Sequence, residues 1–131
     1  MSNLSAWVKD VFGVTPKDIS LYERALTHGS HGSETYERLE FLGDRVLGLV
    51  VAHWIYGRFP NDAEGQLSQR SNTLVSGETC AEVGRTINLS SRMRLGKQAL
   101  DDGAYDSDNV LGDVVEALIG AVFLENGLEA A

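Results

Sequence analysis

Five carboxylates occur in two short segments, at spacings that would bring them together on helices. In the first segment, Glu37, Glu40 and Asp44 are separated by three and four residues, which places them on one side of an α-helix. Like charges at these spacings destabilise a helix by about 0.2–0.5 kcal/mol per pair. An ordinary solvated face would carry basic side chains among the acidic ones. The segment therefore predicts an acidic face that some partner must compensate.

The second segment carries Asp113 and Glu116, three residues apart, within the strongly apolar stretch 110–123. A helix this apolar should be largely buried, and burying a carboxylate without a partner is energetically expensive. A bound metal ion would supply that partner, and hard cations such as Mg²⁺ or Mn²⁺ prefer oxygen ligands. Either acidic segment alone is more typical of a solvated face. Two of them, both in otherwise apolar helices, favour a metal centre.

Small residues beside both acidic segments would allow the two helices to cross closely. Gly48 and Ala52 lie on the acidic side of the first helix, and Ala117 and Gly120 lie on that of the second. The opposite side of the first helix carries a row of apolar residues that we expect to face the core. These are Leu39, Leu42, Val46, Leu49 and Val50.

The hydrophobic pattern has helical periodicity almost throughout and shows no convincing alternating strand. Thr15-Pro16 is typical of an N-cap followed by the first residue of a helix, whereas the stretch 88–106 gives the weakest pattern. We expect an all-α domain of six or seven helices. The predicted helices lie near residues 3–12, 17–27, 35–57, 63–75, 77–86 and 107–126.

Bulk composition limits the classes of protein that remain possible. Cys80 is the single cysteine, which excludes an internal disulfide and favours a reducing compartment. We expect it to be a small core residue. The N-terminus lacks the pattern of a signal peptide, and the longest apolar stretch, 46–56, is too short to span a bilayer. The expectation is a soluble, cytoplasmic protein.

The net charge of −8 has the wrong sign for a protein that binds phosphates. Divalent cations bound among the carboxylates could invert the local field, or a separate basic module could supply the affinity. Some basic side chains could contact phosphates, or they could simply be solvated. These are Arg70, Arg92, Arg94 and Lys97.

The segment Glu37–Asp44, ERLEFLGD, is similar to the signature of the ribonuclease III family. Other segments resemble the same family in order and spacing, although each would be weak alone. The octapeptide is highly specific, and together the segments identify the chain as a member over roughly residues 20–128. The other segments are ALTHGS at 25–30, FP at 59–60 followed by Glu64-Gly65, LGK at 95–97 and DVVEALIGA at 113–121.

The resemblance implies an endoribonuclease that hydrolyses double-stranded RNA and assembles as a symmetric homodimer, each subunit cutting one strand. It implies that Glu40, Asp44, Asp113 and Glu116 bind Mg²⁺, with Mn²⁺ as a substitute. Asp44 and Glu116 would be the catalytic residues. The products would carry 5′-phosphate and 3′-hydroxyl ends and serve RNA processing, and no organic cofactor is implied.

Two further acids correspond to accessory positions of the family, Glu37 in the signature and Glu64 in the lining of the cleft. The sequence departs from the family at Arg45, where a small residue is usual, and at Gln98-Ala99, where Gly-Glu is usual. Arg45 is expected to lie on a flank, clear of the metal ligands. Residues 1–131 are expected to be the endonuclease domain, in a fragment without the family's final helix and RNA-binding domain.

Phe41 lies beside the acidic face and away from the expected core side. An exposed phenylalanine contributes little to a monomer, whereas a dimer could insert it into a socket on its partner. We therefore predict that Phe41 forms a dimer contact. Packing within one chain remains the alternative.

Two other interpretations stay open. A non-catalytic family member would bind duplex RNA without cutting it, although all four expected acids are present. A di-iron carboxylate bundle would need Glu-x-x-His pairs on two helices, and the glutamates of the candidate segments lack that histidine. His28 and His31 have zinc-like spacing but no further ligand nearby, so capping or packing is the expected role.

Overall fold

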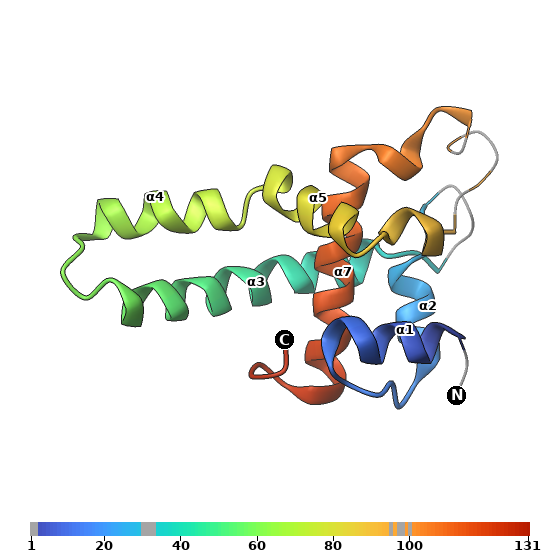
Figure 1. The fold of residues 1–131 in the computed structure, drawn as a ribbon, viewed down its shortest axis with the longest axis horizontal. Coiled ribbons are helices and arrows are strands. Elements are labelled where there is room, and N and C mark those ends of the chain that lie inside the picture. Colours follow the sequence, from blue (N-terminus) through green and yellow to red (C-terminus); the bar gives the residue numbers. More distant parts are fainter. Residues whose placement is uncertain (1–2, 30–33, 95, 97–98, 100) are drawn as a thin grey trace.

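The computed structural model describes residues 3–29, 34–94, 96, 99 and 101–131, apart from the side chain of Tyr105. Within these residues, six α-helices and two short 3-10 helices form the fold, and the β-type pairing is one isolated bridge between Thr27 and Arg94 (Figure 1). The prediction of an all-α domain is confirmed. The helices are α1 (Asn3–Phe12), α2 (Ile19–Ala25), α3 (Glu37–Arg58), α4 (Glu64–Leu74), α5 (Gly77–Thr86), η1 (Leu89–Arg92), η2 (Ala104–Asp106) and α7 (Asp108–Asn126).

Helix α7 forms the centre of the molecule, and α3 and α5 pack closely against it (Figure 1). Ten of its 19 residues are buried, among them Leu111, Val114 and Leu118. Apolar side chains surround most of the helix, and this explains its central position. The predicted burial of this segment is confirmed, so a charged side chain in its buried part, such as that of Glu116, must find its partner inside the protein.

Helices α3 and α7 cross with their backbones in contact, and two glycines make this contact possible. A Cβ atom on Gly43 would lie 1.6 Å from the carbonyl oxygen of Glu116, and one on Gly120 would lie 2.5 Å from that of Leu39. Either side chain would force the helices apart. The predicted role of Gly120 in a close crossing is therefore confirmed.

Beyond the crossing, α3 leaves the core and forms with α4 a hairpin that projects from the rest of the molecule (Figure 1). A Cβ atom on Gly48 would meet nothing within 4 Å, and Ala52 is exposed. The prediction that these two residues admit a second helix is wrong. Leu49, expected in the core, is 56% exposed. A helical wheel repeats along the whole of a long helix, whereas the neighbouring helix covers only part of it.

Helix α2 begins at Ile19, later than the Thr15-Pro16 pattern predicts. Its N-cap is Asp18, whose carboxylate accepts a hydrogen bond from the backbone N–H of Ser20 at 3.0 Å. The carboxylate of Glu125 accepts from the N–H groups of Lys17 at 3.1 Å and of Asp18 at 2.6 Å. A side chain at the end of α7 thus fixes the turn before α2, and no local pattern can show this.

The segment that gives the weakest pattern contains η1 and η2. Its described part is fastened to the end of α2 by two backbone hydrogen bonds of 2.8 Å. The N–H of His28 donates to the carbonyl of Arg94, and the N–H of Arg94 donates to the carbonyl of Leu26.

No helix in the described part of the chain is long and apolar enough to cross a membrane.

The backbone contact predicts opposite effects for two glycines on α3. Gly43→Ala should destabilise the protein by about 3 kcal/mol or more, because the new methyl group meets a carbonyl oxygen that cannot move away. Gly48→Ala should instead stabilise it by up to about 1 kcal/mol, since alanine favours the helix and the site is open. Chemical denaturation of both variants measures the difference. Equal effects of the two substitutions would contradict the tight crossing.

Candidate metal centre

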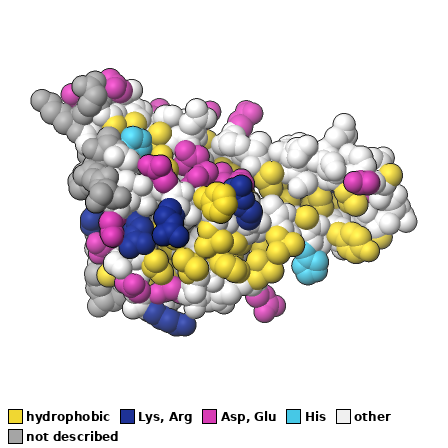
Figure 2. Space-filling view, turned by 180° about the vertical axis from the view of Figure 1, so that it is seen from behind, with side chains coloured by type: hydrophobic (Ala, Val, Ile, Leu, Met, Phe, Trp, Pro, Cys, Tyr) yellow, Lys and Arg dark blue, Asp and Glu magenta, His cyan; other side chains and the backbone are white. Residues whose placement is uncertain are grey.

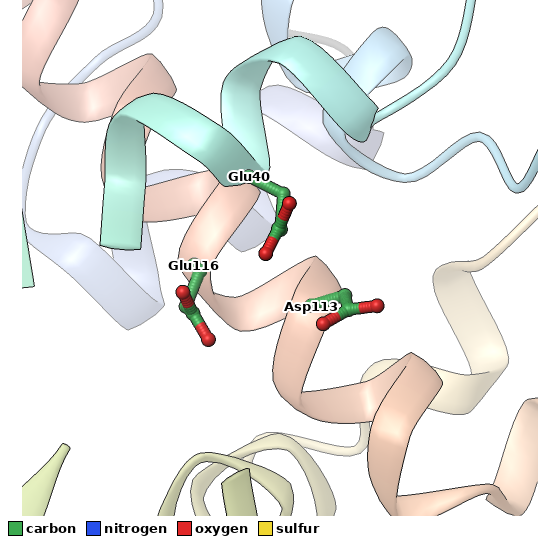
Figure 3. Close-up of side chains that lie close together, drawn as sticks. All are labelled: Glu40, Asp113 and Glu116. Atoms are coloured by element: carbon green, nitrogen blue, oxygen red, sulfur yellow. The ribbon is translucent and has the colours of Figure 1, made fainter. Parts of the chain in front are cut away.

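Three carboxylates converge where α3 crosses α7 (Figure 3). Glu40 comes from α3 and Asp113 and Glu116 come from α7, and each offers a ligand oxygen that lies within 4.8 Å of the other two. The missing side chain at Gly43 allows this approach, because the α3 backbone rests on the backbone of Glu116. Three of the four predicted ligands thus lie together. A cluster with only oxygen donors suits a hard divalent cation.

Glu116 is the buried member of the cluster. The residue is only 7% exposed, and its Oε2 atom has no hydrogen-bond partner among the described residues. Burial raises the pKa of Glu116 to about 8, and a hydrogen bond with Asp44 and the surrounding negative charges contribute to the rise. A buried carboxylate oxygen without a partner destabilises the fold unless it is protonated or bound to a cation. The residues present therefore fit a divalent metal ion.

Glu40 and Asp113 are half-buried, and the pKa of each is raised, as is that of Glu116. Burial raises the pKa of Glu40, and the charges of Asp113 and Asp44 raise it further. Burial also raises the pKa of Asp113, while the charge of His28 and a hydrogen bond with Tyr36 oppose the rise. Repulsion between neighbouring carboxylates raises their pKa values in this way where acids cluster without a cation.

Asp44, the fourth predicted ligand, borders the cluster and is not one of its three converging residues. Its carboxyl group interacts with that of Glu116, and its Oδ2 atom lies 3.3 Å from Nη1 of Arg45. Both side chains of this ion pair are more than half exposed, so the pair contributes little to stability. Arg45 nevertheless lies closer to the predicted ligands than its position on a flank suggests.

Comparison with known proteins identifies the class to which this arrangement belongs. A family model described as "Ribonuclease-III-like" matches residues 18–131. The chain belongs to the ribonuclease III family. The membership that the signature ERLEFLGD and the other segments predicted is therefore confirmed.

Relatives named Ribonuclease 3 span the domain and continue beyond the matched region. The protein of Zymomonas mobilis is 60% identical over 126 residues, which are 96% of this chain and 51% of that protein. The protein of Vibrio cholerae is 45% identical over 119 residues, which are 91% of this chain and 53% of that protein. The chain thus spans about half the length of these relatives.

Solved structures show the same fold. The nuclease domain of ribonuclease III from Campylobacter jejuni superposes with a TM-score of 0.91 at 37% identity, covering 98% of this chain and 88% of that one. Dicer from Pichia stipitis gives a TM-score of 0.67 at 35% identity, covering 86% of this chain and 48% of that one. A further Campylobacter structure is described as flexible in a region involved in dimer formation.

The two accessory acids of the ribonuclease III resemblance are exposed and do not belong to the converging group. Oε1 of Glu37 lies 3.4 Å from the hydroxyl of Thr35, which donates to it. Glu64 is the first residue of α4, where a negative charge stabilises the helix N-terminus. Their roles towards RNA stay predictions.

Other predicted residues have structural contacts. Cys80 is 3% exposed and lies in the core, as expected. The ring of His28 packs edge-on against Tyr36 with centroids 5.9 Å apart, which agrees with a packing role, while His31 lies outside the described residues.

Three of the four basic residues suggested for phosphate contacts interact with other residues of the chain. Nε of Arg70 lies 2.6 Å from Oδ2 of Asp62, and Nη2 of Arg94 lies 3.5 Å from Oε2 of Glu23. The guanidinium of Arg92 lies 5.6 Å from the centre of the Trp7 ring. Lys97 is outside the described residues, and contact of any of these residues with RNA stays a prediction.

Tyr36 is the site residue that the sequence patterns miss. It directly precedes the signature, its carbonyl accepts from the N–H of Glu40 at 2.8 Å, and burial and the charge of Asp113 raise the pKa of its hydroxyl. The one available signal is an aromatic residue at the N-terminal boundary of the acidic helix. An aromatic residue at such a boundary is usually explained by packing alone.

Proposed function

We propose that this chain is a metal-dependent endoribonuclease that hydrolyses double-stranded RNA in RNA processing, leaving 5′-phosphate and 3′-hydroxyl ends. The observation that carries the proposal is the convergence of Glu40, Asp113 and Glu116 around a buried oxygen that has no hydrogen-bond partner in the described part of the chain. Membership of the ribonuclease III family supports the substrate class. The buried single cysteine, Cys80, agrees with a reducing cytoplasm.

The three converging acids would hold Mg²⁺, or Mn²⁺ in its place, with Asp44 at the border of the site. When bound, the cation supplies an activated water molecule and neutralises charge on the phosphate. Burial raises the pKa of Glu116, whose carboxyl group interacts with that of Asp44, and this pair would hold or move a proton beside the phosphate. We assign the catalytic roles to these two residues, and the apolar walls of α7 keep bulk water away from Glu116.

We further propose that the chain acts as a homodimer through Phe41. This side chain is 59% exposed, and beside it lies a hollow of about 680 Å³ with apolar walls that include Leu39, Leu42 and Leu124. Figure 2 shows hydrophobic side chains gathered in a band across one face of the molecule. A two-fold axis would place the Phe41 ring of each copy against the hollow of the other.

The metal centre predicts a specific loss of cleavage. With Mg²⁺ and low salt, the chain should cut a labelled RNA duplex, and Glu116→Gln should slow cutting by at least about 100-fold because an amide is a poorer metal ligand. Glu82→Gln, which neutralises an exposed acid on α5, is the matched control and should cut normally. Full activity of Glu116→Gln, or of the unaltered chain in excess chelator, would remove the support for this assignment.

The dimer contact predicts a change in assembly. Phe41→Ala should shift the chain towards monomer in sedimentation, because the ring no longer fills the partner's hollow, while circular dichroism shows the helices retained. Val83→Ala truncates another exposed apolar side chain, on α5, and should leave the dimer intact. A Phe41→Ala protein that stays dimeric at all concentrations would count against the proposed interface.

A further inference from the structure

We propose that Arg45 is a phosphate-binding residue, whose guanidinium group contacts the backbone of duplex RNA beside the metal centre. The inference rests on the proposed cleavage of RNA and adds a basic contact to it. Arg45 directly follows the signature, at a position where the ribonuclease III resemblance leads us to expect a small residue. The contact is therefore one that the resemblance itself does not supply.

The helix crossing places Arg45 at the edge of the acidic cluster. The backbone of Gly43, two residues earlier on α3, rests on that of Glu116, and Glu40 belongs to the converging group. A helix rises 1.5 Å per residue, so the backbone of Arg45 lies only about 7.5 Å along the axis from that of Glu40. Nη1 of Arg45 lies 3.3 Å from Oδ2 of Asp44, which holds the guanidinium on this side of the helix.

Three contacts fix the orientation of the guanidinium. Nη1 donates to the carbonyl of Phe41 at 3.2 Å and to Oδ2 of Asp44 at 3.3 Å. The central carbon of the group lies 3.9 Å from the centre of the Phe41 ring, a cation–π contact that aligns the plane of the group with the ring. Both hydrogen bonds to described residues use Nη1. Nε and Nη2, which together can bind two oxygens of one phosphate, are left for another acceptor.

Stability does not account for this arrangement. The side chain of Arg45 is 61% exposed and that of Asp44 is 51% exposed, and exposed ion pairs of this kind contribute little to folding. An exposed guanidinium whose orientation is already fixed loses little freedom when it binds phosphate. The geometry of Arg45 thus suits ligand binding better than it suits packing.

The charge of the chain makes a basic contact at this place necessary. The net charge is −8, and the converging acids repel the phosphates that flank the one to be cut. Two basic residues suggested from the sequence, Arg70 and Arg94, pair with acids outside the converging group. Arg45 also pairs with an acid, but it lies beside the cluster, where the RNA backbone must approach the proposed cation.

The test is the binding of a fluorescent RNA duplex, measured by anisotropy at fixed Mg²⁺ and increasing KCl. All proteins carry Glu116→Gln, for which slow cutting is expected, so that the duplex stays intact. Arg45→Ala should raise the Kd about tenfold at low salt. It should also reduce the slope of log Kd against log KCl by about one per subunit, because one phosphate contact is lost. Arg45→Lys keeps the charge and should keep most of the slope.

The matched control is Arg58→Ala, which removes the same charge from the same helix. Arg58 also lies over an aromatic ring, with its guanidinium 5.3 Å from the centre of the Trp54 ring. It is 13 residues beyond Arg45, roughly 20 Å further along α3. This variant should therefore keep the affinity and the salt slope of the parent protein.

The outcomes separate the inference from the proposal on which it rests. Loss of affinity and slope in Arg45→Ala alone, with the dimer retained in sedimentation, supports the phosphate contact. An unchanged slope overturns it, and so does an equal loss in Arg58→Ala, which would reflect overall charge. Loss that accompanies dissociation into monomers also overturns it, by assigning Arg45 to the dimer contact. Absence of duplex binding before any change at position 45 would instead overturn the proposed RNA substrate.

Discussion

The backbone contact between α3 and α7 is the constraint on which the site depends. With glycine at positions 43 and 120, the two helices approach until backbone meets backbone, and Glu40 then reaches Asp113 and Glu116. Larger residues at these points would separate the helices, and the three oxygens would no longer face one another. Core packing and the candidate chemistry therefore depend on the same contact. The hairpin beyond it tolerates more variation because its residues are largely exposed.

This arrangement places an acidic side chain in the apolar centre of the domain, where packing alone would favour an apolar residue. Helix α7 is apolar enough to form the centre of the domain, yet it carries Glu116, whose Oε2 atom has no hydrogen-bond partner among the residues that the structure describes. Such groups destabilise a protein, and functional sites are where proteins retain them. The surroundings affect the pKa of Asp113 and the pKa of Glu116 differently. Burial raises the pKa of Asp113 and the charge of His28 opposes the rise, whereas burial and the neighbouring acids raise the pKa of Glu116 to about 8.

Much of the site could be predicted because its signals are local. Asp113, Glu116 and Gly120 stand out within an apolar helix, and the spacing from Glu40 to Asp44 places both acids on one side of α3. Relations between distant segments could not be predicted. The wheel predicted a crossing at Gly48 and a core position for Leu49, because it cannot show where α7 meets α3, whereas the contact lies at Gly43 and Leu49 is exposed. The turn before α2 depends on Glu125 of α7, which accepts from the N–H of Asp18 at 2.6 Å, and this contact joins segments far apart in the sequence.

The central claim is that the acid cluster destabilises the cation-free fold and that a divalent cation relieves this. The most direct measurement is the difference in the free energy of unfolding, wild type minus Glu116→Gln. It is measured as a function of pH, first in chelator and then in Mg²⁺. The folded-state pKa of Glu116, about 8, lies above its ordinary value of 4.5. The unfolded chain therefore releases this proton first, and the difference should fall as pH rises from about 4.5 to about 8 in chelator. Mg²⁺ should remove the fall by binding the folded state. The account would be contradicted if this difference in unfolding free energy did not change with pH in chelator, and if Mg²⁺ changed it no more than a monovalent salt of equal ionic strength.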